Sequence, residues 1–268
     1  IGGKYMKFIL ELGKGILIGA GCILPGISSG VLCVIFGIYE KLLDSILNFF
    51  TDIRKNLKFL FPIALGGFIG MILFSKFLEF LLYKYPLQTN SLFIGLILEG
   101  IVLLYKDIRK KHKLKLNNIL YLVVSLVIGI SMVYFENKIG IKNIENVSYI
   151  YLIASGILMS IGIVVPGVSS TIILMLLGIY STYLNAVSTL YLPVLIPISI
   201  GVFIGSIIFM KIIKYLLDNF YVQTMFSIIG FTLGSIFVLL PETNTILETI
   251  ILVISVICGY NIIKIINN

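Results

Sequence analysis

The sequence predicts an all-α integral membrane protein with an inverted-topology repeat, in which each repeat holds one re-entrant helical hairpin and about three transmembrane helices. Three observations predict this fold: the apolar composition, an internal duplication and the positions of the basic residues. Hydrophobic residues make up 59% of the 268 residues and charged residues 12%, whereas soluble domains average roughly 45–50% and 25%. The mean hydropathy is +1.12. We therefore expect residues 1–268 to form a single membrane domain.

The chain contains a duplication. Residues 15–39 match residues 156–180 at 11 of 25 positions when aligned with an offset of 141, including a Pro-Gly-x-Ser-Ser and a Gly-Ile-Tyr sequence. With an offset of 135, the similarity continues through Pro62/Pro197, Gly66/Gly201, Phe68/Phe203, Gly70/Gly205, Phe74/Phe209, Lys76/Lys211, Gln88/Gln223, Thr89/Thr224 and Gly95/Gly230. Apolar composition alone does not align prolines, lysines and glutamines in one order. We therefore expect one repeat over 8–140 and a second, inverted repeat over 148–268.

Six apolar runs are long enough to cross a bilayer, which takes about 20 helical residues: roughly 60–83, 90–105, 117–135, 190–213, 223–240 and 246–263. The two Pro-Gly-x-Ser-Ser segments differ, because each has only about ten apolar residues on either side of its break. Ten helical residues span about 15 Å, which is half of the hydrocarbon thickness. These segments therefore predict hairpins that enter and leave the membrane by the same face.

The basic residues favour hairpins over full spans, because cytoplasmic loops carry the excess of Lys and Arg. The most basic loop, 106–115, is placed in the cytoplasm. With both motifs as hairpins, the N- and C-termini are also cytoplasmic and the cation-free segment 181–190 is outside, whereas full spans would send the N-terminal lysines outside. The net charge of +8 is therefore assigned to topology and not to a nucleic-acid partner.

The duplicated motif has the features of an interrupted helix that binds an anion. Proline and glycine end the first arm, and the serines stand where N-cap residues open the second arm. A helix that begins inside a membrane leaves about four N–H groups unpaired and carries roughly half a positive charge there, which suits phosphate or carboxylate. We expect the headgroup-binding residues to be Pro25, Gly26, Ser28, Ser29, Gly30, Pro166, Gly167, Ser169, Ser170 and Thr171. The alternative is that the serines only cap their own helices and the hairpins are structural plugs.

Eight further polar residues are secondary candidates: Lys76, Lys211, Gln88, Gln223, Thr89, Thr224, Glu99 and Arg54. The two lysines occupy equivalent repeat positions and could attract a phosphate, or extend to lipid headgroups as lysines near helix ends do. The Gln-Thr pairs could line a headgroup path or cap helices. The glutamate stands within an apolar run, where a carboxylate is costly, so proton coupling is one interpretation. The arginine could contact lipid phosphate or only set the topology.

Three stretches carry a family resemblance: Ile23-Leu-Pro-Gly-Ile-Ser with Gly37-Ile-Tyr-Glu-Lys, Tyr85-Pro86 followed by Phe93-Ile-Gly-Leu-Ile-Leu, and Val165-Pro-Gly-Val-Ser-Ser with Gly178-Ile-Tyr. With these, the chain resembles the polyprenyl-phosphate transporter family of PopT-type proteins, formerly a domain of unknown function, over nearly its whole length. The resemblance implies a carrier in the bacterial cytoplasmic membrane, surrounded by membrane lipids. Its implied substrate is undecaprenyl phosphate or a related polyprenyl phosphate, moved from the outer to the cytoplasmic leaflet for reuse. No catalytic residue, metal or cofactor is expected.

On the residues alone, three other functions are open. Undecaprenyl-pyrophosphate phosphatases also look like inverted repeats with hairpins, but hydrolysis needs acid–base groups and a cation at the phosphorus, and no arginine stands beside either motif. A transporter of a small soluble anion also fits, because the half-helix site does not require a lipid tail. A purely structural membrane subunit is the third.

Overall fold

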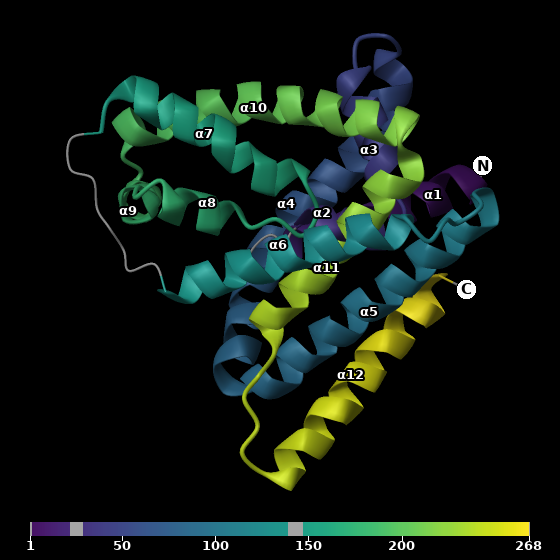
Figure 1. The fold of residues 1–268 in the computed structure, drawn as a ribbon. Coiled ribbons are helices and arrows are strands. Elements are labelled where there is room, and N and C mark those ends of the chain that lie inside the picture. The colour runs from purple at the N-terminus through teal and green to yellow at the C-terminus, as the bar shows by residue number, and fades with distance from the viewer. Residues whose placement is uncertain (1, 22–28, 139–146, 268) are drawn as a thin grey trace. The chain divides into compact units, whose positions relative to one another are not determined.

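The protein is all-helical in the computed structural model, which describes residues 2–21, 29–138 and 147–267 (Figure 1). The all-α part of the fold prediction is therefore confirmed. Contacts divide the chain into two compact units: unit 1 is Ile1–Leu114 with Ile236–Asn268, and unit 2 is Lys115–Ser235. These units have different limits from the sequence repeats.

Each unit contains six helices within the described ranges. Unit 1 holds α1 (Gly2–Gly21), α2 (Ser29–Ile35), α3 (Tyr39–Leu47), α4 (Ile53–Lys84), α5 (Pro86–Lys111) and α12 (Ile246–Asn267). Unit 2 holds α6 (Asn118–Lys138), α7 (Tyr149–Val164), α8 (Ser170–Leu176), α9 (Tyr180–Thr189), α10 (Leu192–Asn219) and most of α11 (Tyr221–Leu239). In unit 1, α12 packs along α5. With the repeat limits that the sequence predicts, 8–140 and 148–268, α6 would belong to the first repeat and α12 to the second, so that each unit would include one helix of the other repeat.

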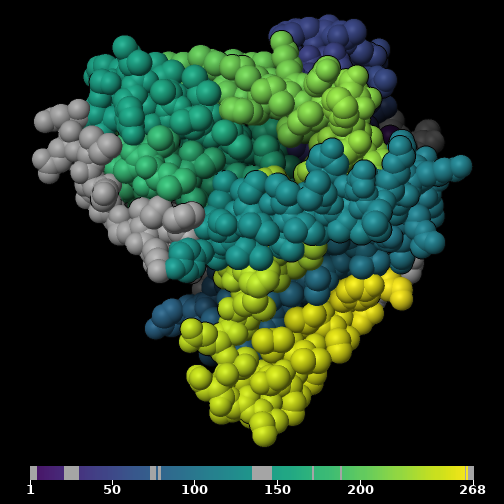
Figure 2. Space-filling model, in the orientation of Figure 1, coloured from purple at the N-terminus to yellow at the C-terminus, as the bar shows by residue number. Residues whose placement is uncertain are grey.

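Four described helices are long and apolar enough to cross a membrane: Ile53–Ile72 of α4, Pro86–Lys111, Leu192–Asn219 and Tyr221–Leu239. The described apolar parts of α6 and α12, Asn118–Tyr134 and Ile246–Ile262, are shorter. All six helices lie where the sequence predicts spans. One side of α12, yellow in Figure 2, exposes an apolar row: Ile246, Ile250, Val253, Ile254 and Ile257. Large exposed apolar surfaces of this kind are typical of helices that face lipid.

Glycines shared by the two repeats lie where helices cross. Gly15 of α1 is so close to the α4 backbone that an added Cβ would overlap the carbonyl group of Ile63. Its counterpart in unit 2, Gly156 of α7, is equally close to the carbonyl group of Ile198 in α10. Small residues at such crossings let membrane helices pack with their backbones in contact. The shared glycines therefore build the same helix pair in each unit.

The Gly-Ile-Tyr sequences end one short helix and begin the next. Gly37 has a φ of 64°, and the N–H of Ile38 donates to the carbonyl of Cys33 at 2.9 Å, which closes α2 with a Schellman motif. Gly178 and Ile179 close α8 in the same way. Helices α3 and α9 follow directly. Residues 181–190, which the sequence predicts as a loop, are therefore mostly helical, because a nine- or ten-residue helix gives no span signal.

Candidate functional site

The second Pro-Gly-x-Ser-Ser motif joins α7 to α8 within unit 2. Pro166 is buried, and Gly167 has a left-handed φ of 83°, which glycine adopts without steric cost. A Cβ added to Gly167 would lie 2.6 Å from the carbonyl carbon of Phe231 and 2.7 Å from the backbone nitrogen of Thr232. The break between the two helices therefore packs directly on the backbone of α11.

Helix α8 runs back along α7, so that the two form a helical hairpin. At the start of α8, the backbone nitrogen of Ser170 lies against Gly162 in the last turn of α7. After the end of α8, the carbonyl of Leu177 accepts a hydrogen bond of 2.7 Å from the hydroxyl of Tyr151, in the first turn of α7. The two arms are thus antiparallel.

Unit 1 has a corresponding contact between α1 and α2. The Nζ of Lys14, on α1, donates to the carbonyl of Phe36 at the end of α2, over 3.3 Å. Phe36 and Leu177 are equivalent positions of the two repeats. In both units, therefore, a side chain of the first arm binds the carbonyl that follows the second arm.

The serine at the start of α8 caps its own helix. Ser169 is the N-cap residue, and its side-chain oxygen accepts a hydrogen bond of 3.4 Å from the N–H of Ile172. This bond is the capping role given above as the alternative. It uses an acceptor position of the hydroxyl and leaves the hydroxyl hydrogen to donate elsewhere.

Thr232 adds a hydroxyl that the sequence reasoning missed. Its side chain is only 1% exposed, and its Oγ1 has no hydrogen-bond partner among the described residues. A buried hydroxyl without a partner costs about 1–3 kcal/mol, so an added hydrogen-bonding group would be stabilising there. The backbone of Thr232 contacts the Gly167 turn. The available signal was a threonine within an apolar span, at the position where the first repeat has Ile97.

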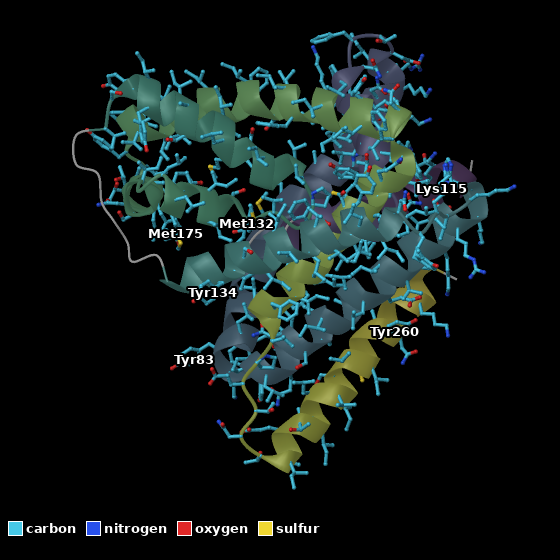
Figure 3. All side chains as sticks on the ribbon, in the orientation of Figure 1. Tyr83, Lys115, Met132, Tyr134, Met175 and Tyr260 are labelled. Carbon is cyan, nitrogen blue, oxygen red and sulfur yellow. The ribbon has the colours of Figure 1, made fainter. Side chains whose placement is uncertain are left out.

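Glu99 lies near the middle of α5, in unit 1. It is 2% exposed, and its Oε2 has no hydrogen-bond partner among the described residues. The side chain of Tyr260, labelled on α12 in Figure 3, is close enough to interact with the Glu99 carboxyl group. The next residue, Gly100, packs on Ile35 at the end of α2. The equivalent position in unit 2 is Gly234, which packs on the α6 backbone.

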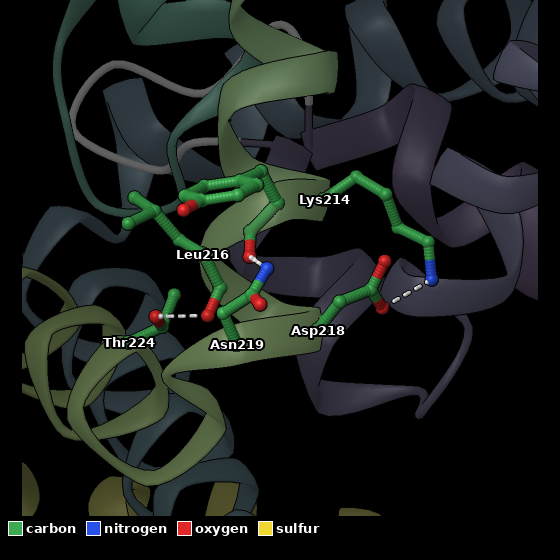
Figure 4. A network of polar contacts seen from close by, with 6 residues as sticks. Lys214, Leu216, Asp218, Asn219 and Thr224 are labelled. Carbon is green, nitrogen blue, oxygen red and sulfur yellow. Dashed lines mark hydrogen bonds and ion pairs between the residues drawn. The ribbon is translucent and has the colours of Figure 1, made fainter.

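Thr89 and Thr224 hold equivalent helix junctions. The hydroxyl of Thr224 donates to the carbonyl of Leu216 at 3.1 Å, across the junction of α10 and α11 (Figure 4). It also donates to the carbonyl of Phe220, at 2.9 Å. Thr89 makes the corresponding two bonds across the junction of α4 and α5, at 2.7 and 3.3 Å. These contacts are those of the capping alternative. The structure therefore gives both threonines a role in joining helices.

The other expected site residues that the structure describes differ in exposure. Gln88 and Lys211 are exposed, Gln223 is half-buried, and Arg54 is exposed in the first turn of α4. Gly30 is buried in α2. Pro25, Gly26 and Ser28 lie outside the described residues, as do the side chains of Ser29, Lys76 and Thr171.

Comparisons with known proteins point to one family. Residues 18–252 match the family described as VCA0040-like, undecaprenyl phosphate translocase-like. A polyprenyl-phosphate transporter of Vibrio cholerae serotype O1 is 30% identical over 257 residues, covering 91% of this chain and 81% of that protein. A polyprenyl-phosphate transporter of Staphylococcus aureus is 30% identical over 258 residues, covering 91% of both chains. No solved structure matches the chain.

Proposed function

Because the chain belongs to the undecaprenyl phosphate translocase-like family, we propose that it carries undecaprenyl phosphate, or a related polyprenyl phosphate, across a bacterial cytoplasmic membrane. The observation that carries this proposal is the family match over residues 18–252, which includes both Pro-Gly-x-Ser-Ser motifs. Both relatives described above bear the name of such a transporter. The direction that we propose is from the outer to the cytoplasmic leaflet, where the lipid is reused.

The proposed mechanism moves only the headgroup through protein. An isoprenoid tail can stay in lipid, whereas an isolated charge in hydrocarbon costs far more than the several kcal/mol of one unpaired polar group. Two re-entrant hairpins would replace water with fixed N–H and hydroxyl donors near the middle of the membrane. Unit 2 supports this idea, because Thr232, whose buried hydroxyl has no partner among the described residues, has its backbone nitrogen against the Gly167 turn. Rocking of two inverted repeats would then expose the headgroup to each leaflet in turn.

The proposed topology places both termini and the loop 106–115 in the cytoplasm. Single cysteines at Lys113 and Asn185, both exposed, would be introduced after replacement of the three native cysteines. A membrane-impermeant thiol reagent added to intact cells should label the cysteine at 185 and not the one at 113. Labelling of both positions from one side would refute the hairpin topology.

The transport proposal is tested in liposomes with a leaflet-resolved assay of polyprenyl phosphate. Ser28→Leu and Ser169→Leu should each abolish transport in folded protein, whereas Ser131→Leu, on α6, should not. Full transport by both motif variants would refute the donor site. Release of phosphate from undecaprenyl pyrophosphate by the purified protein would instead favour an enzyme. Uptake of inorganic phosphate without lipid movement would favour a small-anion transporter.

A further inference from the structure

Lys41, on α3 of unit 1, is within electrostatic reach of three other lysines, which are Lys7 and Lys14 on α1 and Lys55 on α4. These four lysines, with Glu11 of α1, are called the lysine cluster below. Burial lowers the pKa of Lys41, and the three other ammonium groups lower it further, while Glu11 opposes the change. The protein therefore holds like charges together at an energetic cost.

Two contacts fix ammonium groups of the lysine cluster in place. The Nζ of Lys41 lies 3.6 Å from the ring centroid of Phe59, as in a cation–π contact. The Nζ of Lys14 is held by the carbonyl of Phe36. Glu11 is 9% exposed, and its Oε2 has no hydrogen-bond partner among the described residues. The charges are thus partly preorganised, which is the condition for binding an anion with several donors.

The second repeat shows that the hairpin does not need these charges. With the offset of 141 extended to both sides, the positions that correspond to Lys7, Glu11, Lys14 and Lys41 are Ser148, Leu152, Ser155 and Thr182. None of these residues is charged, and Leu152 belongs to the buried core of unit 2. Lys14 holds the carbonyl of Phe36 as Tyr151 holds that of Leu177, but unit 2 has no counterpart of the charges at Lys7 and Lys41. These charges therefore have a role other than joining the two arms.

Exposed aromatic residues flank the lysine cluster in the sequence. Tyr5, two residues before Lys7, exposes 67% of its surface, and Phe50, in the turn between α3 and α4, exposes 86%. Aromatic residues beside lysines are typical of the zone where lipid headgroups meet hydrocarbon. This neighbourhood favours an anion that is attached to a lipid chain over a freely dissolved one.

We propose that the lysine cluster is a second headgroup site, which binds the phosphomonoester of an isoprenoid lipid at the membrane surface. The inference rests on the proposed function and adds a place where the headgroup is held before or after it crosses. A phosphomonoester carries nearly two negative charges at neutral pH, whereas the phosphodiester of a bulk phospholipid carries one. Several lysines around one site therefore favour the carried lipid over its neighbours.

The test is equilibrium binding of farnesyl phosphate to the full chain, purified in a neutral detergent and followed by calorimetry. Lys14→Gln and Lys41→Gln should each weaken binding about tenfold, because each removes one charge-assisted hydrogen bond. Lys41→Arg should keep most of the affinity. The control is Lys58→Gln, which removes an exposed lysine of α4 outside the cluster and should change the affinity less than twofold. Circular dichroism checks that each variant is folded.

Three outcomes would overturn the inference: unchanged binding in both glutamine variants, an equal loss in Lys58→Gln, or displacement of the probe by an equal concentration of inorganic phosphate or short-chain phosphatidylglycerol. The leaflet-resolved assay separates this inference from the proposed function. If the wild-type chain transports polyprenyl phosphate while both glutamine variants bind and transport normally, only the lysine cluster site fails. If the wild-type chain binds farnesyl phosphate at the cluster but moves no lipid, only the proposed function fails.

Discussion

Replacement of Gly167 by alanine tests whether the α7–α8 turn really packs on α11. Two costs add at this position. A left-handed φ costs a residue with a Cβ about 1–2 kcal/mol, and an atom forced into a filled space costs about 1–3 kcal/mol. The added Cβ would be 2.6 Å from the carbonyl carbon of Phe231, so both costs apply. We expect Gly167→Ala to lower the free energy of unfolding by about 2–5 kcal/mol.

Two matched variants separate the two costs. Gly37 has a φ of 64° with nothing within 4 Å of an added Cβ. Gly37→Ala should therefore lower the free energy of unfolding by only about 1–2 kcal/mol. Gly13 is in helix α1, with nothing within 4 Å of an added Cβ. Gly13→Ala should therefore raise the free energy of unfolding by about 0.5–1 kcal/mol. Unfolding would be followed by far-ultraviolet circular dichroism during titration with sodium dodecyl sulfate. If Gly167→Ala lowers the free energy of unfolding by no more than Gly37→Ala does, the turn does not pack on α11.

The remaining predictions concern polar groups elsewhere in the structure. Thr89→Val and Thr224→Val should each cost about 1 kcal/mol of unfolding free energy, and nearly equally, because the two hydroxyls make equivalent bonds; clearly unequal losses would contradict this. Tyr260→Phe should lower the melting midpoint, because it removes the hydroxyl that interacts with the buried Glu99 carboxyl group, and the loss should shrink when Glu99→Gly is added. A full loss in the double variant would show that the pair is not coupled. Farnesyl phosphate affinity should fall as pH rises through the lowered pKa of Lys41, since the cluster then loses a positive charge. Lys41→Arg should remove that fall. If the arginine variant has the same pH profile as the wild-type chain, Lys41 is not the titrating group.

The positions of the long helices could be predicted from the sequence, because a run of about 20 apolar residues is typical of a membrane-spanning helix. The repeat also has a structural basis, since the equivalent glycines Gly15 and Gly156 lie at close helix crossings in their units. The short helices α3 and α9 could not be seen in the same way. Helix α3 mixes Glu40, Lys41 and Asp44 with its apolar residues, so its composition resembles that of a loop.

The site was less predictable than the fold, because one side chain often has two possible partners. The N-cap position of Ser169 was readable from the Pro-Gly break, but only coordinates show that its oxygen accepts from Ile172. Thr232 was missed because a threonine within an apolar helix usually bonds a carbonyl of its own preceding turn. The packing of α12 on α5 also could not be predicted from the sequence, since helices of similar repeats have similar surfaces.

The place of α12 in unit 1 has a consequence for biosynthesis. All of unit 2, residues 115–235, is translated between α5 and α12. While the ribosome makes this stretch, helix α5 can pack on α2 and α4 but not yet on α12, and the Glu99 carboxyl group is still without Tyr260. Unit 1 can therefore be completed only after the whole of unit 2 has been synthesised.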